Sequence, residues 1–157
     1  MKFKIVLVTI ALIIKSMLVI ATNVNGNVYG HWTLAGSPYN VINNIIIPID
    51  STLIIDPGVD VIFNANYKFI INGRILAQGL INDSISFYAI NSVPGFGGIR
   101  FENITATQDS SLFEFCNVYH ARVGSSGATG TNNYGGGFFI NNFSKVRIQH
   151  CNMYNNV

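Results

Sequence analysis

Short runs of alternating apolar and polar residues dominate the chain after residue 26. The stretch STLIIDPGVDVIF (51–63) holds two such runs, and Asp56-Pro57-Gly58 separates them. A period of two residues predicts a strand that buries one face. Proline presets φ at the second position of a turn, and glycine accepts the positive φ that a type II turn needs next. This stretch therefore predicts two strands that share one core and meet at a sharp corner.

The same alternation continues to the end of the chain, in runs that stop at Gly, Asn, Asp or Pro. No helical periodicity of useful length competes with it, so the pattern predicts an all-β fold. We expect the apolar positions of these runs to point into the core; they are Leu53, Ile55, Val59, Val61, Phe63, Ile75, Ile99, Phe101, Phe113, Val118, Ile148 and Met153.

Two segments of the chain recur later in the same order. GGIRFEN (97–103) aligns with GGFFINN (136–142), and SLFEFCNVYHA (111–121) aligns with VRIQHCNMYNN (146–156). A β-sandwich does not require such a repeat, whereas a chain that coils upon itself stacks like residues about 4.8 Å apart. The repeat therefore predicts a solenoid of parallel strands. Because His150 falls at the same corner as Phe115, we also expect those two rings to stack.

The composition narrows the possible partners. The chain has 157 residues, enough for one domain with a core of its own, and only 10% of them are charged. The net charge is +2, and Lys and Arg are scattered singly. Nothing in this pattern supports nucleic-acid binding, which needs clustered cations.

Residues 1–26 are predicted to be a signal peptide. A basic start precedes a largely apolar run from residue 5 to residue 14, and cleavage is expected after Ala21 or after Gly26. Lys15 interrupts the apolar stretch, and a membrane span needs about 20 apolar residues, so an uncleaved anchor is the weaker alternative. The sequence thus predicts a secreted or cell-surface protein that has no membrane association after signal cleavage.

The segment GHWTLAGSPYNVINNIIIPIDSTLIIDPGVDVIF (30–63) resembles the opening coils of secreted bacterial right-handed parallel β-helix repeat proteins, which belong to the pectin-lyase-like superfamily. The resemblance rests on a Trp, a Ser-Pro-Tyr, a strand that ends in Pro, and a Leu-x-Ile-x-Pro-Gly-Val; here these are Trp32, Ser37-Pro38-Tyr39, Pro48 and residues 53–59. GRILAQG (73–79) and GFGGIRFEN (95–103) resemble the coils that follow.

The resemblance implies a right-handed parallel β-helix for residues 27–157, and it implies little about activity, since this fold carries many functions. The chain ends in mid-repeat at CNMYNNV, so we expect a truncated member whose full-length version has further coils or a C-terminal sorting domain. The favoured function is a non-enzymatic exported scaffold or carbohydrate-binding module. The alternative is a fragment of a polysaccharide lyase or glycoside hydrolase of the same superfamily.

Catalytic residues of the kind that such enzymes use are not gathered in the sequence. Lyases on this fold hold calcium with clustered carboxylates and use Arg or Lys as a base, as the resemblance implies. The repeat aligns Glu102 and Glu114 with amides and not with carboxylates. Arg100, Arg122 and Arg147 are interpreted as solvated side chains. We therefore predict no catalytic residue, no metal site and no cofactor.

Tyr119 and Tyr154 are the candidate ligand-binding residues, because they recur outward at one coil position beside Asn117 and Asn152. Outward rings can stack on sugars, and amides can bond to hydroxyls, so we predict carbohydrate binding at these four residues, with polysaccharide or another cell-surface component as the partner. The alternative is an aromatic ladder that only stabilises neighbouring strands. The polar loop 121–135 is either a second binding element or a flexible spacer.

Cys116 and Cys151 align at the same inward position of consecutive coils. Their Cα atoms should lie about 4.8 Å apart, a separation that a disulfide allows. In-register parallel strands nevertheless point both Cβ–Sγ bonds the same way, whereas a disulfide needs a torsion near 90°. We therefore predict no disulfide, and we expect both thiols to be buried from alkylating reagents.

Overall fold

The computed structural model describes residues 21–102, 104, 109–124 and 130–157. Residues 1–20 of the predicted signal peptide and residues 125–129 of the polar loop lie outside this part of the chain. The described part is all-β, with fourteen strands and two short 3-10 helices. None of its helices is long and apolar enough to cross a membrane.

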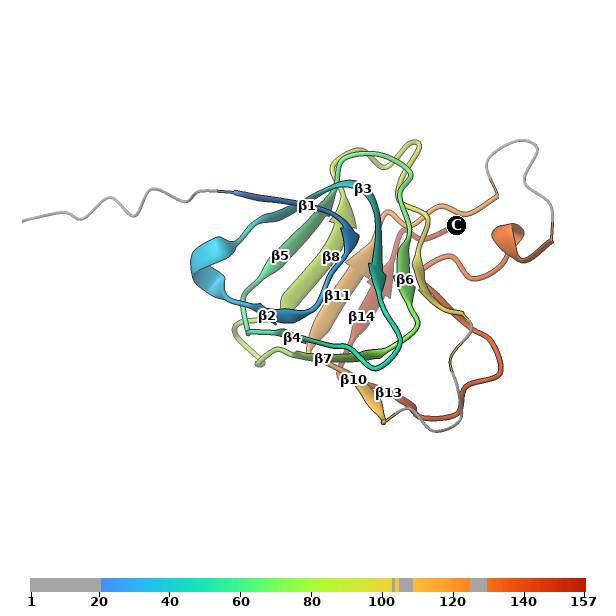
Figure 1. The fold of residues 1–157 in the computed structure, drawn as a ribbon. Coiled ribbons are helices and arrows are strands. Elements are labelled where there is room, and N and C mark those ends of the chain that lie inside the picture. Colours follow the sequence, from blue (N-terminus) through green and yellow to red (C-terminus); the bar gives the residue numbers. More distant parts are fainter. Residues whose placement is uncertain (1–20, 103, 105–108, 125–129) are drawn as a thin grey trace, which may run out of the picture.

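The elements follow one another as short strands joined by turns and loops, as the alternating pattern predicts (Figure 1). The strands are β1 (Thr22–Asn27), β2 (Gly30–Trp32), β3 (Tyr39–Ile47), β4 (Thr52–Ile55), β5 (Asp60–Phe63), β6 (Phe69–Ile71), β7 (Arg74–Gln78), β8 (Ile85–Ala89), β9 (Ile99–Phe101), β10 (Ser111–Glu114), β11 (Cys116–Tyr119), β12 (Phe138–Ile140), β13 (Val146–Gln149) and β14 (Asn152–Tyr154); the 3-10 helices are η1 (Leu34–Gly36) and η2 (Gly130–Asn133).

All pairings between these strands are parallel, and from β4 onward each strand pairs with the strand three places later. Strand β3 turns a corner, because Tyr39–Val41 pair with β5 whereas Ile45–Ile47 pair with β6. The strands thereby form three rows. The first row is β2-β4-β7-β10-β13, the second is β5-β8-β11-β14 and the third is β6-β9-β12, with β3 at the head of the last two.

The pairing confirms the internal repeat. Residues Ser111–Glu114 pair with Val146–Gln149, and Ile99–Phe101 pair with Phe138–Ile140, in the registers that the sequence alignment predicts. Like residues therefore lie beside one another on neighbouring strands, so one pattern of apolar positions serves every strand in a row.

The interior is formed by the apolar side of each strand. Ten of the twelve expected core residues are buried: Leu53, Ile55, Val59, Val61, Phe63, Ile75, Ile99, Phe101, Phe113 and Val118. Burial of each such side chain contributes about 1.5–3 kcal/mol of transfer free energy. Ile148 is partly buried against this core.

Met153 takes the expected inward position, but it is not buried, since its side chain is 49% exposed. Met153 lies in register with buried Val118, so it occupies the inward position that the repeat assigns to it. Its strand, β14, is the last in the order of its sheet, and the described residues place no strand beyond it. An inward position is buried only where another strand continues the core.

Corners between rows use left-handed backbone conformations. Gly58 has φ of 76°, as the predicted turn after Asp56-Pro57 requires. Strands β10 and β11 are separated by Phe115 alone, which has φ of 47°, and His150 has φ of 53° at the equivalent corner. The two rings stack with their centroids 4.9 Å apart and their planes 13° from parallel, which confirms the expected pair.

Arg100 is completely buried, so its interpretation as a solvated side chain is wrong. Its Nε donates a hydrogen bond to Glu102 Oε1 at 2.5 Å, and its Nη1 donates to the carbonyl oxygen of Tyr134 at 3.0 Å. The guanidinium also lies 4.3 Å from the ring centroid of Phe139. The segment around Tyr134 thus covers the outer side of β9, and the buried charge is paired and stacked as a buried cation must be.

Candidate carbohydrate-binding face

The four predicted site residues lie together on the outer side of the second row. Asn117 pairs with Asn152, and Tyr119 pairs with Tyr154, in the parallel register of β11 and β14. Alternate residues of a strand point to the same side, so each pair stands directly beside its counterpart. The structure therefore brings together the residues that the repeat predicts.

The tyrosine pair is part of a longer ladder. The ring of Tyr119 stacks on Tyr154 at 4.9 Å between centroids, and on Tyr88 of strand β8 at 4.8 Å, with the planes 10° and 7° from parallel. We call Tyr88, Tyr119 and Tyr154 the tyrosine ladder. Tyr88 was missed by the sequence analysis, although ISFY (85–88) has the same alternation as CNVY (116–119).

A column of polar side chains runs beside the tyrosine ladder. The register places Asp60, Ser86, Asn117 and Asn152 in line on strands β5, β8, β11 and β14. Asn152 Nδ2 donates a hydrogen bond to Asn117 Oδ1 at 3.1 Å. We call these four residues the polar column, and it adds Asp60 and Ser86 to the predicted site.

The stacking decides which ring faces a ligand can reach. Both faces of Tyr119 are covered, by Tyr88 on one side and Tyr154 on the other. Tyr88 lies in register with Ile62 on its other side. Tyr154 is on the edge strand and is 47% exposed. Within the ladder, Tyr154 therefore presents the accessible ring face, while Tyr88 and Tyr119 present their edges and hydroxyl groups.

The electrostatic environment keeps these hydroxyl groups protonated. Partial burial, followed by the neighbouring Tyr88, Tyr154 and Asp60, raises the pKa of Tyr119 to about 12. Burial and the charge of Asp60 also raise the pKa of Tyr88. The pKa of Asp60 is itself raised by burial, against a hydrogen bond from Ser86 that lowers it. The phenols of Tyr88 and Tyr119 are thus both donors and acceptors of hydrogen bonds at neutral and mildly alkaline pH.

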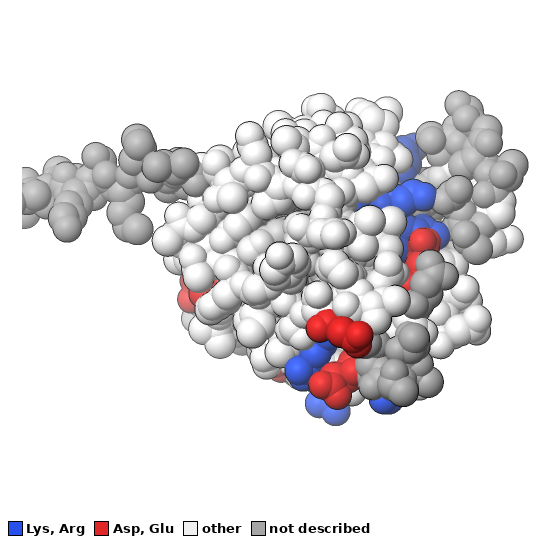
Figure 2. All heavy atoms as spheres, in the orientation of Figure 1, with Lys and Arg blue, Asp and Glu red and all other residues white. Residues whose placement is uncertain are grey.

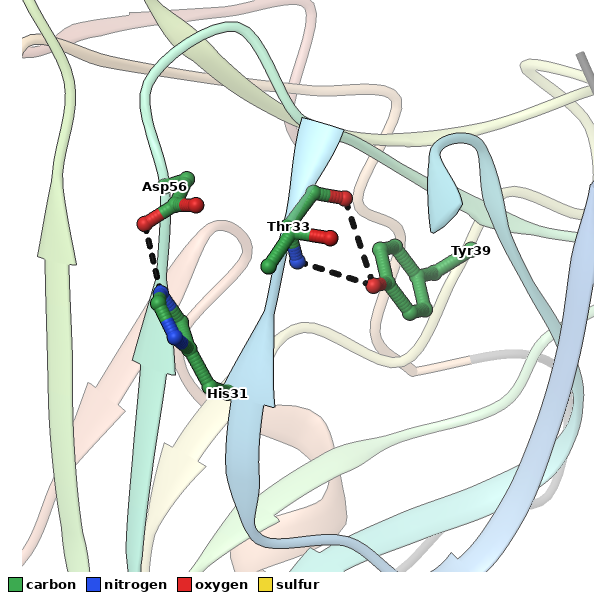
Figure 3. Close-up of polar contacts among 4 residues, drawn as sticks. All are labelled: His31, Thr33, Tyr39 and Asp56. Carbon is green, nitrogen blue, oxygen red and sulfur yellow. Dashed lines mark hydrogen bonds and ion pairs between the residues drawn. The ribbon is translucent and has the colours of Figure 1, made fainter. Parts of the chain in front are cut away.

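Other polar contacts near the start of the fold are structural (Figure 3). His31 Nε2 lies 2.6 Å from Asp56 Oδ1, which links β2 to the corner after β4. Both side chains are well exposed, and surface polar contacts of this kind contribute about 0–1 kcal/mol. The Tyr39 hydroxyl accepts a hydrogen bond from the backbone N–H of Thr33 and donates one to its carbonyl oxygen, at 2.9 Å and 3.3 Å. These bonds tie the start of β3 to the end of β2.

No group of three His, Cys, Asp or Glu side chains in the described part of the chain is placed to hold a metal ion. Each of the three histidines contacts a different residue. His31 is paired with Asp56, His150 is stacked on Phe115, and His120 Nδ1 lies 3.3 Å from the carbonyl oxygen of Ala89. Each of these contacts has a structural role at a corner or a turn.

Cys116 and Cys151 are free thiols that lie beside each other on the inner side of the second row. Cys116 is 1% exposed, as expected, whereas Cys151 is only partly buried because it lies beside the edge strand β14. A hydrogen bond with Cys151, and then burial, raise the pKa of Cys116 above its usual range. The same hydrogen bond lowers the pKa of Cys151 to about 7. The two thiols are thus unequal in access and in acidity.

Comparison of the chain with models of protein families, with curated proteins and with solved structures finds no match. Function is therefore inferred from the residues and their geometry.

Proposed function

We propose that this chain is a right-handed parallel β-helix of the pectin-lyase-like superfamily. Three rows of parallel strands, visited in the same order from β4 onward, support this architecture. Three of the residues that carry the resemblance also make contacts near the start of the fold. Trp32 stacks on Tyr39 with centroids 4.4 Å apart, and Ser37 Oγ accepts a hydrogen bond from the backbone N–H of Asp60 at 2.9 Å.

Its function is that of an exported, non-enzymatic scaffold that binds carbohydrate on the second row. The observation that carries this proposal is the tyrosine ladder beside the polar column. Together they form a flat stripe of phenol, amide, hydroxyl and carboxylate groups that repeats with each strand, about every 4.8 Å. A polymer of sugars that lies along the stripe meets a tyrosine and a polar side chain on each of β8, β11 and β14.

The roles within the stripe differ. Tyr154 offers its accessible ring face for stacking on a sugar ring, which is how aromatic side chains present a large contact area at low entropic cost. Tyr88 and Tyr119 offer hydroxyl groups that are held in place by stacking. Asn117 and Asn152 share a hydrogen bond, so each amide is oriented before a ligand arrives.

A catalytic alternative, the polysaccharide lyase or hydrolase, requires several carboxylates and a base on one outward face. Three carboxylates of the described residues are instead engaged separately. Asp56 pairs with His31, Glu102 bonds to Arg100 and Glu114 Oε1 accepts from Gln149 Nε2. Release of unsaturated or reducing sugar ends from a panel of polysaccharides is the assay that would favour this alternative.

The binding proposal is tested by retention of the chain on insoluble polysaccharides. Tyr154→Ala removes the accessible ring face and should abolish retention. Tyr119→Phe with Tyr154→Phe keeps the stacked rings, removes two hydroxyl groups and should weaken retention.

The matched control is Tyr29→Ala, since Tyr29 is 66% exposed and forms no ring pair among the described residues. Circular dichroism checks that each variant is folded. Equal retention of all variants on every polysaccharide would refute the proposal and leave the tyrosine ladder as a purely stabilising feature.

A further inference from the structure

A second surface feature lies on the first row, away from the tyrosine ladder. Strands β7, β10 and β13 and the loops before β10 and β13 enclose a groove of about 410 Å³. Its lining includes Arg74, Leu76, Leu112, Lys145 and Arg147. Figure 2 shows charged side chains of both signs at the lower edge of the molecule, where Figure 1 places these three strands, and a second group at the right side, whereas the broad face between is nearly free of them.

The groove arises from side chains of unequal length on successive strands. The register places Ser110 beside Arg74 on one side and beside Lys145 on the other. A short serine thus lies between two long cationic side chains. Arg74 Nε donates a hydrogen bond to the carbonyl oxygen of Ser110 at 3.0 Å, which holds the arginine across the middle strand.

An apolar stripe crosses the first row and ends in a cation. Ile54, Leu76, Leu112 and Arg147 follow one another in register on β4, β7, β10 and β13. Ile54 is 41% exposed, and the two leucines are partly exposed. The three apolar residues span two strand steps, about 10 Å, before the stripe reaches Arg147.

Positive charge is concentrated along the groove. Six Lys and Arg residues fall in the described part of the chain, and three of them line this groove. The groove lining contains no Asp or Glu. Asp109, which is 81% exposed, has its carboxylate 3.9 Å from Nη1 of Arg74, a lining residue of the groove. The groove therefore combines a positive end with an apolar path, and its volume is that of a small-molecule site.

We propose that this groove binds an anionic amphiphile, a molecule with a carboxylate, sulfate or phosphate head and an alkyl chain. The head lies between Lys145 and Arg147 on β13, while Arg74 lies two strand steps away on β7, beside Leu76. The chain lies along Leu112, Leu76 and Ile54. Charge complementarity fixes the direction, because two of the three cations of the groove lie on or next to β13, at one end of the apolar stripe. This site is on a different row from the tyrosine ladder, so the proposal does not depend on carbohydrate binding.

The proposal predicts a dependence on both head and chain. In calorimetric titrations of the purified chain, below the concentrations at which micelles form, decanoate should bind more tightly than hexanoate, by about twofold for each added methylene. This is about half of the fourfold expected for full burial, because an open groove covers one side of the chain. Acetate and decyltrimethylammonium should not bind.

Variants separate the two parts of the site. Lys145→Gln with Arg147→Gln should weaken decanoate binding about tenfold, while Lys68→Gln, a cation outside the groove, should leave it unchanged. Asp109→Asn should strengthen binding, because it removes the competing carboxylate. Leu112→Thr keeps a strand-forming residue and should reduce the gain from a longer chain.

Several results would overturn the proposal. Affinity that is equal for decanoate and hexanoate would exclude an apolar path, and affinity unchanged by the double variant would exclude the cationic end. Binding to vesicles of phosphatidylglycerol without binding of monomeric decanoate would assign the face to a membrane surface. Binding of polygalacturonate, dextran sulfate or RNA alone would assign it to a polyanion.

Discussion

Tyr119→Ala tests whether the tyrosine ladder stabilises the fold as its geometry implies. The change removes a ring that is stacked on both sides, at 4.8 Å from Tyr88 and 4.9 Å from Tyr154. A stacked aromatic pair contributes about 0.5–1.5 kcal/mol beyond the area that it buries. Loss of two pairs should therefore lower the free energy of unfolding by about 1–3 kcal/mol.

Three further variants should change stability by smaller amounts. Tyr154→Ala breaks one pair and should cost about half as much. Tyr119→Phe keeps both pairs and should change stability by less than about 0.5 kcal/mol, as should Tyr29→Ala on an exposed loop. For a domain of this size, 1 kcal/mol corresponds to a change of about 2–4 °C in Tm.

The measurement is denaturant-induced unfolding followed by circular dichroism, with the slope compared between variants so that differences reflect stability. The double variant Tyr119→Ala with Tyr154→Ala completes a cycle whose coupling should be about 0.5–1.5 kcal/mol. If Tyr119→Ala costs no more than Tyr29→Ala, or if Tyr119→Phe costs as much as Tyr119→Ala, ring stacking does not stabilise the fold.

Three other predictions follow from the same structure. The pKa of Tyr119 is about 12 in the folded protein and about 10 in the unfolded chain, so the folded state holds the proton more tightly. Stability should therefore fall as pH rises from about 10 to 12. Unfolding midpoints across this range should fall less steeply in Tyr119→Phe, and an equal slope would contradict the raised pKa. Iodoacetamide should label Cys151 in the native protein before buried Cys116, and both after unfolding without reductant; a mass two protons lighter, with no labelling on unfolding, would reveal a disulfide. Strand β1 begins at Thr22 and pairs with β3, so signal cleavage after Ala21 would leave this strand whole. N-terminal sequencing of the processed protein should therefore give Thr22 as the first residue, and a start at Asn27 would contradict this.

The sequence by itself determined the alternating strands after residue 50, the corner at Asp56-Pro57-Gly58 and the register of the two repeated segments, but it assigned most of strand β1 to the signal peptide. Alternation marks which side of a strand is apolar, and Asp56-Pro57-Gly58 marks a corner, because both depend on local backbone and side-chain chemistry. The repeat fixed which residues stand beside one another, since parallel strands in register place equivalent positions together. For this reason the sequence alone pairs Tyr119 with Tyr154.

Only the tertiary structure decided what covers each position. Met153 and Cys151 hold the inward positions of Val118 and Cys116, yet they are more exposed because β14 is an edge strand. Arg100 alternates outward, yet it is buried beneath the segment that contains Tyr134.

The free face of Tyr154 and the groove between Arg74 and Arg147 likewise depend on strands far apart in the sequence. A periodic pattern specifies the direction of a side chain within its own strand. Burial, access and charge density depend on the neighbouring strands and loops, which the pattern does not contain.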